Sequence, residues 1–114
     1  MDPVSAVLIN KALDGLSMRA TATAQNVANA NSPGYRAVRV SFEDALVAAA
    51  RQGGAAVRRT QPTVEHVPQT GVGAEMRLDL ELATASQTAM RYAALIDLLG
   101  RQLQISRAVI RGGQ

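Results

Sequence analysis

The sequence predicts a mainly α-helical chain whose long N- and C-terminal helices pair as a coiled-coil-like hairpin, with a short middle helix and an extended loop or small β-hairpin. Two observations support this fold class. Near both ends, apolar side chains recur at alternating steps of three and four residues, which places them along one narrow seam of a helix. Between these periodic stretches, prolines and glycines are frequent, and both interrupt regular structure.

The N-terminal helix is expected over residues 1–31. Asp2 followed by Pro3 suits an N-cap with proline in the first helical position, where the missing N–H is not needed. The helix should end near Asn29, because Pro33 disfavours helical backbone at the residue before it. The larger apolar members of its seam are Ile9, Leu13, Leu16 and Val27.

The middle of the chain divides into a turn with a short helix, at residues 32–52, and a loop or extended region at residues 53–81. Residues 41–44 form a capping-box pattern ahead of an apolar stretch, and a glycine pair should end the short helix. The loop has room for one β-hairpin. Leucines alternate with charged residues over 76–82, which indicates extended chain entering the next helix.

The C-terminal helix is expected over residues 82–113 and repeats the construction of the first helix. Arginines lie toward its end, where cations interact favourably with the helix dipole. The larger members of its seam are Tyr92, Ile96, Leu99, Leu103 and Ile110. Because alanine-rich seams bury little apolar area, this hairpin should need further helices around it. The four segments thus form one structural domain that belongs to a larger assembly.

Composition narrows the functional classes. The absence of cysteine excludes disulfides and thiolate metal sites, and the single histidine, His66, lies in a proline-flanked loop without neighbouring ligand residues. The net charge of +3 is dispersed along the chain, unlike a nucleic-acid-binding stripe. The longest apolar run, Ala45 to Ala50, is too short to cross a bilayer. We therefore predict no enzymatic activity, no cofactor, no metal, no nucleic-acid partner and no membrane insertion.

One motif is more specific than these patterns. The segment at residues 25–36 reads QNVANANSPGYR. It resembles the signature of flagellar rod and hook axial proteins, which runs approximately Asn-x-x-Asn-x-x-Thr/Ser-Pro-Gly-Tyr-Lys/Arg. The matching positions are Asn26, Asn29, Ser32, Pro33, Gly34, Tyr35 and Arg36. The only departure is mild, since serine stands at position 32 where threonine is commoner.

The motif also has an ordinary physical interpretation. Pro33 and Gly34 suit the central positions of a type II turn, in which glycine accepts a positive φ. Asn26 and Asn29 can bind the exposed carbonyls of the helix end or a neighbouring backbone, and Tyr35 provides a large anchor with a polar tip. Without the family match, this cap-and-turn chemistry would by itself account for the segment.

The resemblance covers residues 1–52 and 75–113, where RVSFEDAL and the tail after residue 84 are similar to a small proximal member of the family. It implies a structural subunit of the basal-body rod, whose partners are other rod proteins, the ring and export-gate base, and further copies of itself. It also implies a place in the periplasmic rod after flagellar type III export without a cleaved signal peptide. Two rivals remain open, a cytosolic helical adaptor and a small basic nucleic-acid-binding protein, beside another small axial protein of the proximal rod.

Overall fold

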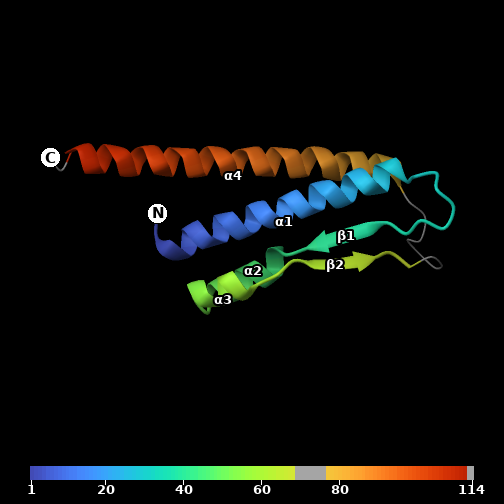
Figure 1. Cartoon of the computed structure of the whole chain (residues 1–114), viewed down its shortest axis with the longest axis horizontal. Coiled ribbons are helices and arrows are strands. Elements are labelled where there is room, and N and C mark those ends of the chain that lie inside the picture. The colour runs from blue at the N-terminus through green and yellow to red at the C-terminus, as the bar shows by residue number, and fades with distance from the viewer. Residues whose placement is uncertain (69–76, 113–114) are drawn as a thin grey trace.

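The computed structural model describes residues 1–68 and 77–112. Its elements are α1 (Pro3–Ala28), β1 (Val38–Ser41), α2 (Glu43–Ala50), α3 (Gly54–Arg59), β2 (Thr63–His66) and α4 (Leu78–Gly112). The long helices α1 and α4 are antiparallel and lie side by side, while the shorter elements cover the opposite side of α1 (Figure 1). The prediction of a mainly helical chain with long terminal helices and a short β-hairpin is confirmed.

The ends of α1 follow the local rules that the sequence indicated. The Asp2 carboxylate accepts hydrogen bonds from the Ser5 backbone N–H and hydroxyl, both at 2.8 Å, and Pro3 occupies the first turn. At the other end Asn29 is the C-cap, and its backbone N–H donates to the Gln25 carbonyl at 3.0 Å. Both bounds of the helix were therefore predictable from capping chemistry.

The two short strands pair antiparallel, with Val38 opposite His66 and Ser41 opposite Thr63. Only the second strand lies in the predicted loop, and α2 and α3 both lie between the strands. The helix α3 was not predicted; it is preceded by Gly53, whose φ of 111° is a conformation that glycine accepts readily. The predicted loop at residues 53–81 thus contains a helix, a strand and the first turn of α4.

The short helix α2 was predicted, but the capping box was the wrong reason for it. Ser41 is the last residue of β1, where it pairs across the ladder, and Phe42 is the N-cap with no side-chain capping bond. The helix is instead fixed by burial of its apolar side chains. Leu46 and Ala49 contribute to a core between α1, β1, α2 and α3, in which Val57 is fully buried.

Phe42 marks the closest approach within this core. Its ring lies directly against Gly15 of α1, so that a Cβ at residue 15 would come within 2.5 Å of the ring. The Arg19 guanidinium covers the same ring at 4.7 Å from the centroid. A glycine in the middle of α1, normally unfavourable in a helix, is therefore required by packing.

The helix α4 begins at Leu78, four residues before the predicted start, so the expectation of extended chain was wrong for residues 78–81. The Glu81 backbone N–H already donates to the Arg77 carbonyl at 3.0 Å, which closes the first helical turn. Glu81 is buried against α1 while the alternating leucines Leu78, Leu80 and Leu82 are exposed. Packing of this segment on α1 therefore outweighs a period-two pattern this short. Met76, the first residue of that pattern, lies outside the described residues.

Candidate functional site

Of the signature residues, Asn26 is the one that is fully buried, near the C-terminal end of α1. Its amide nitrogen donates to the Val38 carbonyl and to a Glu81 carboxylate oxygen, both at 3.0 Å. Its amide oxygen accepts from the Val38 N–H at 2.8 Å and from the Tyr35 hydroxyl at 3.0 Å. An asparagine side chain has two donor and two acceptor positions, and all four are used here. Asn26 thus joins α1, the turn, β1 and α4.

Glu81 completes this network from the first turn of α4. Its residue exposure is only 3%, although an ionised carboxylate is costly to bury without partners. One of its oxygens accepts from Asn26, and the other pairs with the Arg39 guanidinium at 2.7 Å. Arg39 is half exposed, so the ion pair reaches from the interior to the surface. The carboxylate is therefore buried with each oxygen occupied.

The turn itself has the geometry that its residues favour. The Tyr35 N–H donates to the Ser32 carbonyl at 3.2 Å, and Gly34 has a φ of 74°, as the third position of a type II turn requires. Asn29 ends the helix by donating from its side chain to the Gln25 carbonyl at 2.9 Å, and accepts from the Ser32 hydroxyl at 3.1 Å. The predicted cap-and-turn chemistry is confirmed residue by residue.

Arg36 carries the motif into the β-hairpin. Its guanidinium donates to the carbonyls of His66, the last residue of β2, at 3.4 Å and of Val67, the next residue, at 2.9 Å. The Val67 N–H in turn donates to the Ala37 carbonyl at 2.8 Å. Because Arg36 holds the strand end beside the turn, the last signature residue also has a structural partner in this chain.

A second polar cluster lies at Arg19, closer than Asn26 to the N-terminus of α1. The Arg19 guanidinium donates two bonds to the Glu43 carboxylate, at 2.6 and 2.7 Å, and further bonds to the Val40 carbonyl. These bonds lower the pKa of Glu43 to about 2, chiefly through the Arg19 hydrogen bonds. Arg91 of α4 also approaches Glu43, at 3.5 Å, with both side chains about half exposed. This cluster fixes α2 on α1 and meets α4 at the surface.

The predicted seam residues are placed unequally. Ile9, Leu13 and Leu16 are buried in the single chain, and Val27 and Leu99 are half-buried. The exposed members are Tyr92, Ile96, Leu103 and Ile110. The face that α4 turns toward α1 runs through Glu81 and Thr88, both 3% exposed, rather than through Leu82 and Ala89. These four exposed side chains are therefore not buried by other residues in the part of the chain that the structure describes.

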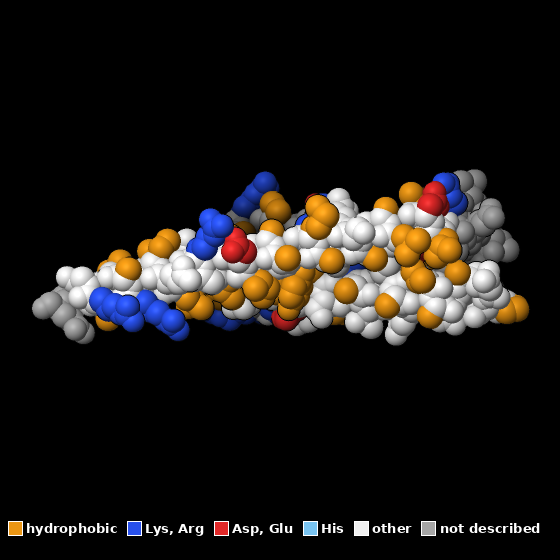
Figure 2. All heavy atoms as spheres, turned by 90° about the horizontal axis from the view of Figure 1, so that it is seen from above, with side chains coloured by type: hydrophobic (Ala, Val, Ile, Leu, Met, Phe, Trp, Pro, Cys, Tyr) orange, Lys and Arg blue, Asp and Glu red, His pale blue; other side chains and the backbone are white. Residues whose placement is uncertain are grey.

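Two parts of α4 differ in this respect. We call residues 78–102 the docked part, because its contact face lies on α1, and residues 103–112 the overhang. Every residue of the overhang is exposed, and α4 continues past the N-terminus of α1 (Figure 1). Figure 2 shows hydrophobic side chains along much of the outer face of α4, with basic side chains toward the C-terminal end. The exposed apolar side chains of the overhang are Leu103, Ile105, Val109 and Ile110.

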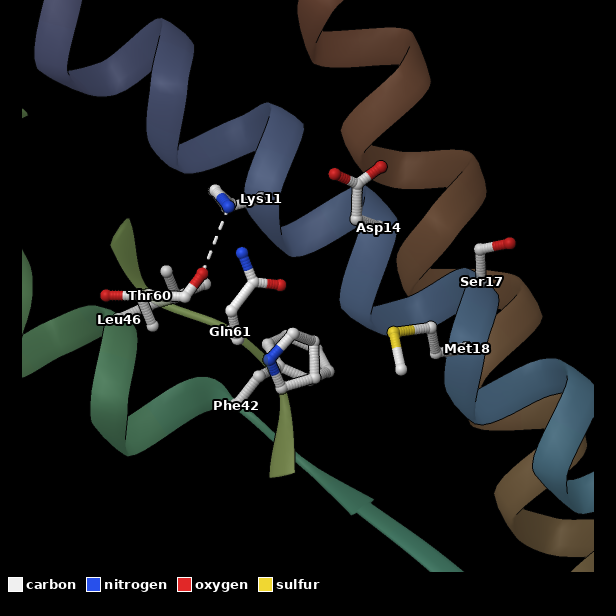
Figure 3. A pocket seen from close by; sticks show the side chains of 9 residues that line it. Lys11, Asp14, Ser17, Met18, Phe42, Leu46, Thr60 and Gln61 are labelled. Atoms are coloured by element: carbon white, nitrogen blue, oxygen red, sulfur yellow. Dashed lines mark hydrogen bonds between the residues drawn. The ribbon is translucent and has the colours of Figure 1, made fainter. Parts of the chain in front are cut away.

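A groove lies on the side of α1 that faces away from α4. It lies between α1 and the segment after α3, with Phe42 and Leu46 at its base (Figure 3). Lys11 crosses it and donates from Nζ to the Thr60 carbonyl at 3.0 Å. This bond connects α1 to Thr60, the C-cap residue of α3.

Among residues 1–68 and 77–112 there is no cluster of three His, Cys, Asp or Glu side chains that could hold a metal ion. None of the helices within these ranges is both long enough and apolar enough to cross a membrane. Comparison with protein-family models and with curated proteins finds no match to this chain. Its function is therefore inferred from the motif and the geometry described above.

Sequence reasoning missed Glu81 and Arg39 as partners of the motif, and it assigned Glu43 to helix capping. The signal for Glu81 was weak, since a carboxylate among alternating leucines resembles an exposed position of a strand. Arg39 likewise occupies an outward position of β1. Only the packing of α4 on α1 brings these charges to Asn26.

Proposed function

We propose that this protein is a structural subunit of the bacterial flagellar basal-body rod. The observation that carries the proposal is the segment QNVANANSPGYR at the end of a long N-terminal helix, with each position of the rod and hook signature in place. In this role the chain polymerises with other rod proteins and its own copies into the proximal drive shaft, which transmits torque for motility. It acts without a cofactor.

Within that family, the chain most resembles the proximal rod protein FlgB. The likeness rests on its short length, on RVSFEDAL after the turn, and on the tail QTAMRYAALIDLLGRQLQISRAVIRGG. Distal rod and hook members carry a large middle domain, whereas here residues 29–77 separate the terminal helices, and the described ones among them form two short paired strands and two short helices. The resemblance also places the subunit in the periplasmic rod, after export through the flagellar type III apparatus with an uncleaved N-terminus.

The distribution of apolar surface supports an assembling subunit. Contiguous exposed apolar side chains mark interaction surfaces, and here they follow α4 through Tyr92, Ile96, Leu103 and Ile110. An alanine-rich groove also runs between α1 and α4, lined by residues such as Ala20, Ala24 and Ala89. Small side chains of this kind let neighbouring helices approach closely. We propose that these surfaces pack against neighbouring rod helices in a coiled-coil-like layer around the axis of the shaft.

The experiment that tests the function is deletion of the gene, with motility and the basal bodies in membrane extracts as readouts. We expect non-motile cells that lack rods, and restoration of both by the wild-type gene. Swimming cells with complete rods would exclude the rod function. A cytosolic adaptor would then be the leading alternative. Binding to DNA with a steep salt dependence would instead favour the small basic nucleic-acid-binding protein.

A further inference from the structure

We propose that Asn26 and Glu81 form a register lock, which sets the axial position of α4 on α1 and hence how far the overhang projects. The role is a positioning one and concerns the single subunit. It goes beyond the rod function and does not depend on it. The repeated alanines and leucines of the same helix pair, by contrast, discriminate only weakly between registers.

The apolar side chains between α1 and α4 repeat at four-residue intervals. On α1, Ala20, Ala24 and Ala28 line the groove between the two helices; on α4, Ala85, Ala89 and Ala93 line it, Leu95 and Leu99 are half-buried, and Leu103 is exposed in the overhang. Four residues are close to one helical turn, so sliding α4 by one turn places alanine on alanine and leucine on leucine. These side chains therefore discriminate only weakly between the two registers. Thr88, which is 3% exposed, adds to the selection, because Tyr92 would take its place after the shift.

The polar network is not repeated in this way. If α4 moves by one turn toward its N-terminus, Ala85 takes the place of Glu81 opposite Asn26. The Asn26 amide then loses one of its four partners, and Arg39 loses its carboxylate. Buried polar groups without partners are strongly disfavoured, and a single buried polar contact can fix the alignment of paired helices. The observed register is the one that satisfies this pair.

The contact between Arg91 of α4 and Glu43 has much less influence on the register. The two side chains lie 3.5 Å apart with exposures of 50% and 44%. Water can replace such a contact, so exposed pairs contribute little. In contrast, Asn26 is fully buried and Glu81 is 3% exposed. Of these two polar contacts, the buried pair therefore has the stronger influence on the position of the overhang relative to the signature turn.

The test uses the full chain, which has no cysteine and therefore accepts two introduced labels cleanly. Thr21→Cys and Gln104→Cys are both at exposed sites, the first in the C-terminal half of α1 and the second in the overhang of α4, so that in this antiparallel pair they are separated mainly along the helix axes. Spin labels at these sites report the α1–α4 register through their distance distribution. For the otherwise unchanged chain we expect one narrow distance. A broad or multiple distribution for this chain would overturn the proposal.

Three substitutions then distinguish a change in the α1–α4 register from a loss of stability. Glu81→Ala should add a second distance, displaced by about one helical turn or 5 Å. Glu81→Gln keeps an acceptor for Asn26 and should retain the original distance. Asp79→Ala removes an exposed carboxylate from the same first turn and serves as the matched control.

A variant with the carboxylate moved by one turn, Glu81→Ala with Ala85→Glu, gives the sharpest outcome. We expect a single distance again, but displaced by about 5 Å, because the carboxylate introduced at position 85 would meet Asn26 in the shifted register. If Glu81→Ala unfolds the chain, as loss of the helical circular dichroism signal would show, the double variant alone tests the proposal. The original distance, or loss of helical structure in the double variant as well, would overturn the lock. A normal rod assembly phenotype would bear on the proposed function but not on this result.

Discussion

The docked part and the overhang of α4 belong to one continuous helix, yet different interactions hold them. The docked part has a buried carboxylate at Glu81, with Asn26 and Arg39 as partners, and a half-buried leucine at position 99. The overhang at residues 103–112 is exposed at every position, including four large apolar side chains. Helices in water are stabilised mainly by packing of an apolar face. Residues of the docked part should therefore govern the fold, and those of the overhang should govern association.

The largest expected effect is at the centre of the docked part. Asn26→Leu leaves the Glu81 carboxylate, the Val38 N–H and the Tyr35 hydroxyl without the buried partner that Asn26 provides. We expect the free energy of unfolding to fall by about 3–5 kcal/mol, the range for breaking one side of a buried charged network. Urea denaturation measures it.

Asn10→Leu, at an exposed position of the same helix, is the control and should change stability by less than about 0.5 kcal/mol. Equal effects of the two substitutions would contradict the central role of Asn26.

The next prediction compares aspartate substitutions along α4. Leu99→Asp places a charge at the half-buried contact with α1 and should lower the free energy of unfolding by about 2–3 kcal/mol. Ile110→Asp, in the overhang, should leave it unchanged within about 0.5 kcal/mol. If the proposed function holds, both should abolish rod formation and motility while the protein is still made.

Gln104→Asp is the control for this series, because its side chain is already polar and exposed. It should preserve stability, rods and swimming. Motile cells with normal rods carrying Leu99→Asp or Ile110→Asp would show that the seam does not contribute to assembly.

A pair of glycines gives a smaller contrast. Gly15→Ala should cost about 2 kcal/mol, since the new methyl group would lie 2.5 Å from the Phe42 ring, which Arg19 covers. Gly100→Ala, in α4 with no atom within 4 Å of the added carbon, should stabilise by about 0.5–1 kcal/mol through helix propensity. Thermal unfolding of both variants tests the contrast. A stabilising Gly15→Ala would mean that Phe42 does not pack on α1 as described.

The smallest expected effect depends on pH. The pKa of Glu43 is lowered from 4.5 to about 2, so its ionised form is favoured by folding. Its contribution is complete above about pH 4.5 and is lost as the pH falls toward 2. Because the side chain is 44% exposed, solvent screening keeps this contribution small.

The stability difference between wild type and Glu43→Gln should therefore shrink from pH 7 to pH 2. Asp44→Asn removes the same charge from the next residue and is the control. A difference for Glu43→Gln that grows on acidification would contradict the Arg19–Glu43 pairing.

Sequence alone determined those features whose causes are local. The cap at Asp2, the helix end at Asn29 and the turn through Gly34 follow from groups within a few residues of one another. The two long helices were also predictable, because a three-four apolar spacing sustained over many residues is the pattern of one face of a helix. The signature motif further indicated which residues hold this part of the chain together, and Asn26, Tyr35 and Arg36 do so through hydrogen bonds to other segments.

Tertiary structure decided everything that depends on contacts between distant segments. The alternating leucines near Leu80 indicated extended chain, yet that stretch is helical, and its Glu81 packs on α1 beside Asn26, 55 residues away in the chain. Ser41 was assigned to a cap and instead pairs with Thr63 across the two strands. The face of α4 that meets α1 runs through Glu81 and Thr88. Sequence alone did not identify it, because alanines and leucines stand on several faces of this helix, and the partners of the Glu81 carboxylate, Asn26 and Arg39, are distant in the chain.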